Sequence, residues 1–280
     1  MYVDRETVQK GLRIWRELPC LEQKCSLGGS YEVHACTIIA RSKYGTDDMY
    51  YADRNRQTMM VIDGAGGIEG SRRFAETFRA SYIESGYDKT SLGYECPDDA
   101  IRDLVEDIYA AARYTVSVQE YGDAPIAFAR FAQLKGEPHI FLGSLGDCRG
   151  YAFEREGKRH HVSVTSDDTS PNGGFGYGLK SLGNGECPLE HLIDKCFFLP
   201  FNDTTTVGLL TDGAWKPLEL ELDHGLIYGR NAYELALRAK MIVASRLNMV
   251  DDGLTVMFGY PASQSNRIFD HGTQIYSSTK

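Results

Sequence analysis

The order of the expected secondary-structure elements is the feature that most limits the fold of this chain. Strand-like runs come first, then a pair of helices, then a second series of strand-like runs and a late helix. Alternating strand and helix units, which build parallel sheets, do not fit this order. The sequence therefore predicts an α+β layered domain.

The strand predictions rest on short runs rich in β-branched and aromatic residues. The segments 49–53 and 57–63 lie on either side of the polar turn RNR, which predicts a hairpin. The other runs are the segments 31–42, 125–134, 139–145, 149–155, 160–166, 195–201, 204–212 and 254–260.

Helical spacing of apolar residues predicts helices over the segments 4–18, 70–85, 98–121 and 231–247. Pro19 would stop the first helix, and Asp98 or Asp99 is available to cap the third. The segment 21–30 is interpreted as a linker, and the glycine-rich segment 170–187 as a mobile loop.

Composition and charge exclude several classes of protein. The net charge is -9, the sequence pI is about 5.3, and no basic cluster is present. These values disfavour a nucleic-acid or anionic-membrane partner. We also find no apolar run of 18 residues and no signal-peptide core in this sequence. Seven scattered cysteines without a CxxC pair indicate free thiols, so a cytoplasmic location is expected.

Aspartates beside glycine at the ends of apolar runs are the candidate chemistry of this chain. They occur in VIDGAGG (61–67), SLGDCRGY (144–151), GLLTDGAW (208–215) and MVDDGLTVMF (249–258), with a further acidic pair in KYGTDD (43–48). A strand end fixes the position of a carboxylate, and glycine lets other oxygens approach the same ion. Converging carboxylates suit magnesium or manganese rather than zinc. A single Asp-Gly pair is more often only a turn.

The four motifs, taken in order, resemble the metal-dependent type 2C serine/threonine protein phosphatases, in a compact bacterial-like form. The matching segments are VIDGAGG, SLGDCRGYAF followed by VTSDDTS, LLTDGAW and DDGLTVMF, and their order and approximate spacing match the family over residues 31–260. The resemblance implies a sandwich of two antiparallel sheets flanked by helices, with a two-metal site at one end. We therefore expect a helical extension at 1–28, a catalytic domain at 29–260 and a polar tail at 261–280.

The resemblance also implies a role for each matching residue. Asp63 would bridge two Mn²⁺ or Mg²⁺ ions, the Gly64 carbonyl and Asp47 would serve one ion, and Asp212 and Asp252 would serve the other. The implied reaction is hydrolysis of phosphoserine and phosphothreonine in proteins by a metal-activated bridging water.

Three further residues have implied roles around that centre. Asp48 would be a carboxylate behind the ligands, and Asp147 would help to hold a weak third ion. Lys43 stands where the family usually has an arginine that grips phosphate, so it keeps the charge but loses the bidentate fork.

Several positions depart from the family pattern. Ala65 stands where many eukaryotic members have a histidine that protonates the leaving group, and Gly253 replaces an asparagine. Lys216 stands where an acidic ligand of the third ion is common, and a cation there disfavours that ion. Asp47 is one methylene shorter than the usual glutamate.

Two other functions stay open from the sequence. One is a pseudophosphatase that acts as a binding or regulatory module without turnover, and the other is hydrolysis of a small phosphorylated metabolite. The apolar face of the helix at 4–18 could cover its own domain, or Trp15 could anchor a partner or dimer contact there.

Overall fold

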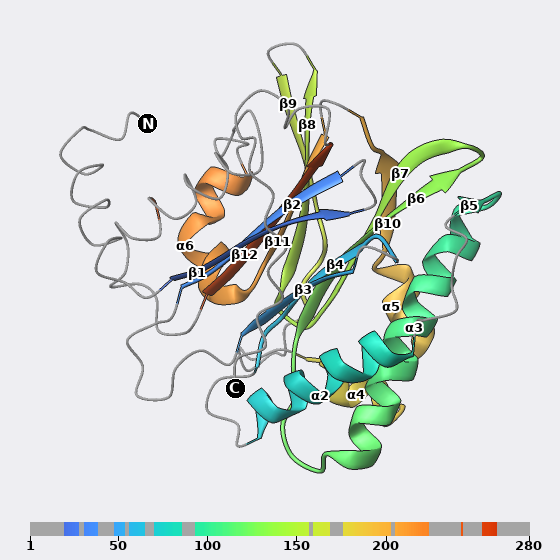
Figure 1. Ribbon diagram of the computed structural model, residues 1–280, viewed down its shortest axis with the longest axis vertical. Helices are drawn as coiled ribbons and strands as arrows, with labels where there is room; N and C mark the ends of the chain where they lie inside the picture. Colours follow the sequence, from blue (N-terminus) through green and yellow to red (C-terminus); the bar gives the residue numbers. More distant parts are fainter. Residues whose placement is uncertain are drawn as a thin grey trace.

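The structure is a computed structural model of the chain. It describes residues 20–27, 31–38, 48–53, 56–64, 70–85, 93–156, 159–168, 176–202, 205–223, 242 and 254–261. Figure 1 shows two β-sheets with a group of helices beside one of them.

The first sheet contains six antiparallel strands among the described residues, in the order β1-β2-β12-β11-β8-β9. Their bounds are Cys20–Leu27 (β1), Tyr31–Ile38 (β2), Arg149–Glu156 (β8), Arg159–Val164 (β9), Thr205–Leu210 (β11) and Leu254–Pro261 (β12). The last of the described strands, β12, therefore lies between β2 from the first half of the chain and β11 from the second.

The second sheet follows the order β10-β7-β6-β4-β3, with antiparallel neighbours throughout, and the short strand β5 pairs in parallel with β6. Its strands are Met49–Asp53 (β3), Thr58–Ile62 (β4), Gly93–Tyr94 (β5), Ile126–Leu134 (β6), Glu137–Leu145 (β7) and Phe197–Pro200 (β10). The predicted hairpin of β3 and β4 is confirmed.

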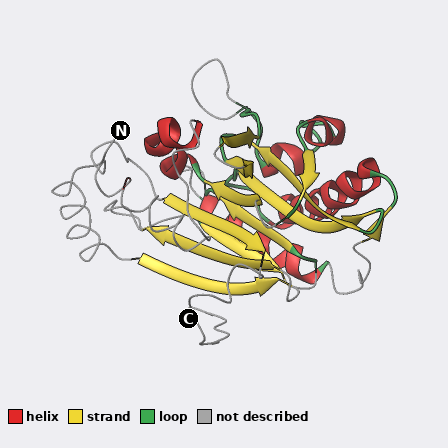
Figure 2. Cartoon of the chain, turned by 90° about the horizontal axis from the view of Figure 1, so that it is seen from above, coloured by secondary structure: helices red, strands yellow, loops and turns green. Residues whose placement is uncertain are grey.

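Both faces of the second sheet are buried. Met59 and Val61 of β4 belong to a cluster that also contains Val207 and Leu209 of the first sheet, so this cluster lies between the sheets. Met60 and Ile62 alternate with them and pack toward the helices. Seen from above, the two sheets form separate layers (Figure 2).

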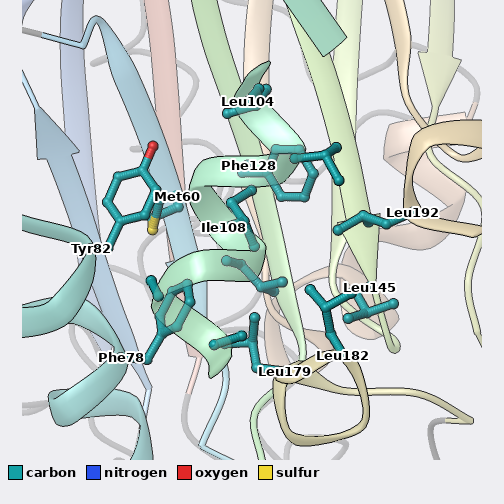
Figure 3. Packing of buried hydrophobic residues seen from close by; sticks show 14 of the residues in the cluster. Met60, Phe78, Tyr82, Leu104, Ile108, Phe128, Leu145, Leu179, Leu182 and Leu192 are labelled. Atoms are coloured by element: carbon teal, nitrogen blue, oxygen red, sulfur yellow. The ribbon is translucent and has the colours of Figure 1, made fainter. Parts of the chain in front are cut away.

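The helices Ser71–Glu84 (α2), Pro97–Val118 (α3), Leu179–Gly183 (α4) and Leu189–Asp194 (α5) share one apolar cluster with β4, β6 and β7. Figure 3 shows part of this cluster: Ile108 of α3 lies near Phe128 of β6, and Leu182 of α4 and Leu192 of α5 lie toward the right of the view. The helix Asp212–Asp223 (α6) lies apart from this group and packs against β12. The predicted sandwich of antiparallel sheets flanked by helices is confirmed.

Three predictions about individual elements are wrong. Most of the predicted linker forms β1, which pairs with β2 along its whole length. Cys96, in extended backbone, is the N-cap of α3, because Pro97 starts the helix with its fixed φ, and Asp98 and Asp99 fall in the first turn. The glycine-rich segment contains α4, whose Leu179 and Leu182 are fully buried.

Several predicted segments lie outside the described residues. These are the helices at 4–18 and 231–247, most of the tail at 261–280, and Trp15 with its partner contact. The domain division at 1–28, 29–260 and 261–280 stays a prediction.

Candidate metal centre

Asp63 and Gly64 follow β4 directly at one end of the second sheet. The Asp63 N–H donates to the Pro125 carbonyl at 2.9 Å, which extends the pairing of β4 with β6 by one residue. The backbone of Asp63 is therefore fixed, and its side chain is almost fully buried at 5% exposure. Gly64 is also buried.

Asp48 links the two sheets at the same end. It precedes β3 and is 7% exposed, and its Oδ2 accepts a hydrogen bond of 2.9 Å from the Thr211 hydroxyl, which follows β11 of the other sheet. Asp212 comes directly after Thr211, so this bond brings the Asp48 and Asp212 segments side by side. The role of Asp48 as a carboxylate behind the ligands stays a prediction.

Asp212 is the first residue of α6. The Thr211 carbonyl accepts from the N–H groups of Ala214 and Trp215, both at 3.0 Å, which begins the helix at this point. A carboxylate in the first turn is favoured by the positive end of the helix dipole. One turn later the Lys216 Nζ lies 2.5 Å from Asp212 Oδ2.

Asp147 lies in the turn between β7 and β8. Burial raises the pKa of its carboxyl from 3.8 to about 6, and the negative charge of Asp212 adds to that shift. The neighbouring Cys148 is fully buried, and its pKa is raised by burial and then by the charges of Asp63, Asp147, Asp48 and Asp212. These shared interactions indicate that four aspartates from both sheets converge around one end of the sandwich.

The donor chemistry at this end fits hard divalent cations. The converging side chains are all carboxylates, and the backbone oxygen of Gly64 follows Asp63 in the chain. Within the described part of the chain, no three histidine, cysteine or acidic side chains form a ready-made metal-binding group. Asp47, Asp252 and Lys43 lie outside the described residues, so their roles stay predictions.

The sequence did not predict a support that holds the Asp147 turn. The Trp215 Nε1–H donates to the Asp147 carbonyl at 2.6 Å, and the Arg149 guanidinium lies 3.3 Å from the centroid of the Trp215 ring. Arg149 also donates to both carboxylate oxygens of Asp167, at 2.8 and 2.7 Å. All these residues lie inside the quoted motifs, but nothing in the spacing connects Trp215 with Asp147.

A second network fixes the other side of the same turn. The Asp168 N–H donates to the Gly146 carbonyl at 2.7 Å, and the Asp168 carboxylate contacts Lys195 Nζ at 2.5 Å and His191 Nε2 at 2.9 Å. Gly146 has a φ of +84°, and a Cβ there would lie 2.7 Å from Pro125 Cβ. Glycine is therefore required at this position.

Solved structures with the same architecture include a serine/threonine phosphatase, PstP/Ppp of Mycobacterium tuberculosis, with 18% identity and a TM-score of 0.58 over 82% of this chain and 98% of that one. RsbX in complex with magnesium has 14% identity and a TM-score of 0.59, covering 86% of this chain and all of that one. The chain has the fold of the bacterial serine/threonine phosphatases. The resemblance drawn from the four motifs is thereby confirmed for the fold.

A third structure, the catalytic domain of PstP in complex with two manganese ions, has 17% identity and a TM-score of 0.55, over 83% of this chain and 98% of that one. No family model and no curated protein matches this sequence. At these identities the similarity establishes the fold, and the activity has to be argued from the site.

Proposed function

We propose that this protein is a magnesium- or manganese-dependent phosphatase that hydrolyses phosphoserine and phosphothreonine in proteins. The observation that carries the proposal is the convergence of Asp48, Asp63, Asp147 and Asp212 from both sheets. Clustered carboxylates repel one another, and a divalent cation removes that repulsion. A chain that served only as a scaffold would have no physical need for such a cluster.

Asp63, the Gly64 carbonyl and Asp212 would hold the ions, together with Asp47 and Asp252. When bound, two such ions lower the pKa of a water and offset the charge of the phosphoryl oxygens. PstP was solved with two manganese ions and RsbX with magnesium, which supports this choice of metal. We propose no third ion for this chain, because Lys216 stands at the position where an acidic ligand of that ion is common.

The residues around the metal ligands have distinct tasks in this proposal. Thr211 orients the Asp48 carboxylate, and Trp215 holds the Asp147 backbone. Lys43 would bind the phosphate as a point charge. Protein-bound phosphate as the substrate is inferred from the similarity to PstP, which is a serine/threonine phosphatase.

The thiols support water as the nucleophile over a cysteine. Cys148 is fully buried with a pKa well above its usual range, and burial raises the pKa of Cys187 to about 11 and of Cys196 to about 12. A thiol is nucleophilic only as the thiolate, so these three groups are inert at neutral pH.

We also propose that the protein acts in the cytoplasm. Cys96, Cys148, Cys187 and Cys196 are free thiols in the structure, which suits a reducing compartment. None of the described helices has the length and apolar character needed to cross a membrane.

The test is the hydrolysis of a phosphothreonine peptide and of an aryl phosphate, each with manganese, magnesium or a chelator. We expect metal-dependent release of phosphate from the peptide, lost in chelator and in Asp63→Asn. Asp194→Asn, the same change at an exposed position on α5, is the matched control and should keep full activity.

The open alternatives give different results in this assay. A pseudophosphatase would show no turnover of either substrate while still binding metal or phosphopeptide in calorimetry. A metabolite phosphatase would hydrolyse small phosphate esters, and the phosphopeptide would be a poor substrate.

A further inference from the structure

Lys216 occupies a place where a positive charge competes with a metal ion. Its Nζ lies 2.5 Å from Oδ2 of Asp212, which is one of the two predicted ligands of the second ion that the family resemblance names. Asp147 and Asp63 also act on the Lys216 ammonium electrostatically. The ammonium therefore neutralises the same carboxylates that an arriving cation would need.

The ion pair between Lys216 and Asp212 can separate without a change in the backbone. The Asp212 side chain is 19% exposed, while that of Lys216 is 55% exposed, and the two residues are one helical turn apart on α6. The lysine stem is flexible, so its ammonium can leave Asp212 without moving the helix. In the ion-paired state the Lys216 Nζ lies 5.8 Å from the centroid of the Trp215 ring, within the range of a cation–π contact.

We propose that Lys216 is a tethered counter-ion that holds Asp212 in the metal-free protein and must be displaced before Asp212 can bind a divalent ion. The inference rests on the proposed metal centre and adds a regulatory property to it. Metal affinity at the Asp212 position would be lowered by the ion pair and by repulsion between the ammonium and the metal. The protein would then load fully only at higher metal concentrations than its carboxylates alone would require.

Calorimetric titration of the full-length, metal-free protein with Mn²⁺ tests the proposal without measuring activity. Lys216→Met keeps the apolar stem and a good helix former but removes the charge. Since exposed ion pairs contribute up to about 1 kcal/mol and the repulsion adds to this, we expect Mn²⁺ to bind about three- to tenfold more tightly. Lys216→Arg, which keeps the charge, should bind Mn²⁺ with an affinity close to that of the original protein.

Lys135→Met is the matched control. Lys135 lies in the turn after β6, at the end of that strand opposite Pro125 and Asp63, so its loss removes one positive charge away from the site. If Lys135→Met tightens Mn²⁺ binding as much as Lys216→Met does, the effect is one of net charge and the proposal is wrong.

Thermal unfolding supplies a second signature. Lys216→Met should have a lower melting temperature than the original protein in chelator, because the aspartates lose their counter-ion. In saturating Mn²⁺ the melting temperature of Lys216→Met should rise more than that of the original protein, so that the difference between the two disappears. A ligand that binds the folded state more tightly stabilises it more by mass action. An equal deficit with and without Mn²⁺ would indicate a merely structural lysine and would overturn the proposal.

The outcomes separate this inference from the proposed function. If the original protein and Lys216→Met bind Mn²⁺ with equal affinity, the proposal that Lys216 competes with the metal ion is wrong, but the proposed metal centre is not contradicted. Absence of Mn²⁺ binding in the original protein and in every variant overturns both.

Discussion

At the scale of single residues, Asp147 is a carboxyl group whose ionised form is destabilised by its surroundings. Its carboxyl is largely removed from water and lies near Asp212, so the ionised form is disfavoured in the absence of metal. Lys216 compensates only part of this charge, because its ammonium is bound to Asp212. The ionised Asp147 carboxylate therefore destabilises the metal-free protein, and the size of this effect depends on pH.

The pH dependence of stability follows from the raised pKa of Asp147. Between pH 3.8 and about 6, the folded protein keeps a proton that the unfolded chain has released, so the free energy of unfolding falls as the pH rises through this window. We expect Asp147→Asn, which imitates the protonated acid, to be more stable than the original protein at pH 7 by about 2 kcal/mol in chelator. Urea denaturation at pH 4 and pH 7 measures this difference, which should nearly vanish at pH 4. A difference of equal size at both pH values would contradict the assignment.

Trp215 provides a second test at this scale. Trp215→Phe removes the donor to the partly buried Asp147 carbonyl and part of the surface beneath Arg149. We expect the free energy of unfolding to fall by about 2 kcal/mol, because the carbonyl loses its partner and a small cavity forms.

Mn²⁺ affinity, measured by calorimetry, should also weaken in Trp215→Phe, since the Asp147 turn loses a contact. Tyr114→Phe, an aromatic substitution at an exposed position on α3, is the control and should leave that affinity unchanged. If Trp215→Phe alters stability alone, Trp215 supports the core rather than the site.

At the scale of elements, α4 shows why a glycine-rich segment is not always a mobile loop. Asp123 Oδ1 accepts from the Lys180 N–H at 2.8 Å and from the Ala124 N–H at 2.7 Å, so this carboxylate from a distant segment caps the start of α4. At the other end of α4, a Cβ on Gly183 would lie 2.5 Å from the Ala112 carbonyl oxygen of α3. The glycines therefore allow close packing rather than freedom of the backbone.

Gly178→Ala tests this packing. Gly178 has an ordinary extended backbone with a φ of -131°, but a Cβ there would lie 2.7 Å from Asp123 Cγ. We expect a loss of about 2 kcal/mol in unfolding free energy, because the cap of α4 must move. Gly93→Ala, where a Cβ meets no atom within 4 Å, is the matched control and should change stability by less than about 0.5 kcal/mol. Equal stability of the two variants would contradict the steric role of Gly178.

At the scale of the whole molecule, a buried ionic group joins the helical layer to the second sheet. Arg130 of β6 is 1% exposed and donates to Asp107 at 2.7 Å and to Asp103 at 2.9 Å, both on α3. Its Nε also donates to Thr58 of β4 at 3.2 Å. Arg130 and Asp107 have little access to water and depend on each other for solvation, whereas Asp103 is 29% exposed.

Arg130→Met should destabilise the protein by about 3 to 5 kcal/mol, because it leaves Asp103 and Asp107 without their buried partner. Arg113→Met, an exposed position on α3, is the control and should change the free energy of unfolding by less than about 0.5 kcal/mol. Urea denaturation measures both values. A loss below 1 kcal/mol in Arg130→Met would mean that packing alone holds the layers together.

The strands and the candidate carboxylates could be predicted from the sequence because both are local patterns. The apolar runs 57–63 and 204–212 contain β4 and β11, and each run ends in an aspartate, Asp63 or Asp212, that lies just after the strand. The Lys216 contact with Asp212 is also local, since residues four apart on a helix lie on the same face.

Only the tertiary structure decided which residues distant in the sequence are in contact. Thr211 and Asp48 are 163 positions apart, and Trp215 and Asp147 are 68 apart, so no spacing in the sequence announces these contacts. The same reason explains why α4 looks like a loop in the sequence: its capping carboxylate, Asp123, is distant in the chain, and its leucines are buried. The strand β1 is different, because its partner β2 follows it directly but its own polar composition does not indicate a strand. The sequence by itself determined the chemistry of the residues and the class of elements, whereas the packing of two sheets brought the carboxylates to one end.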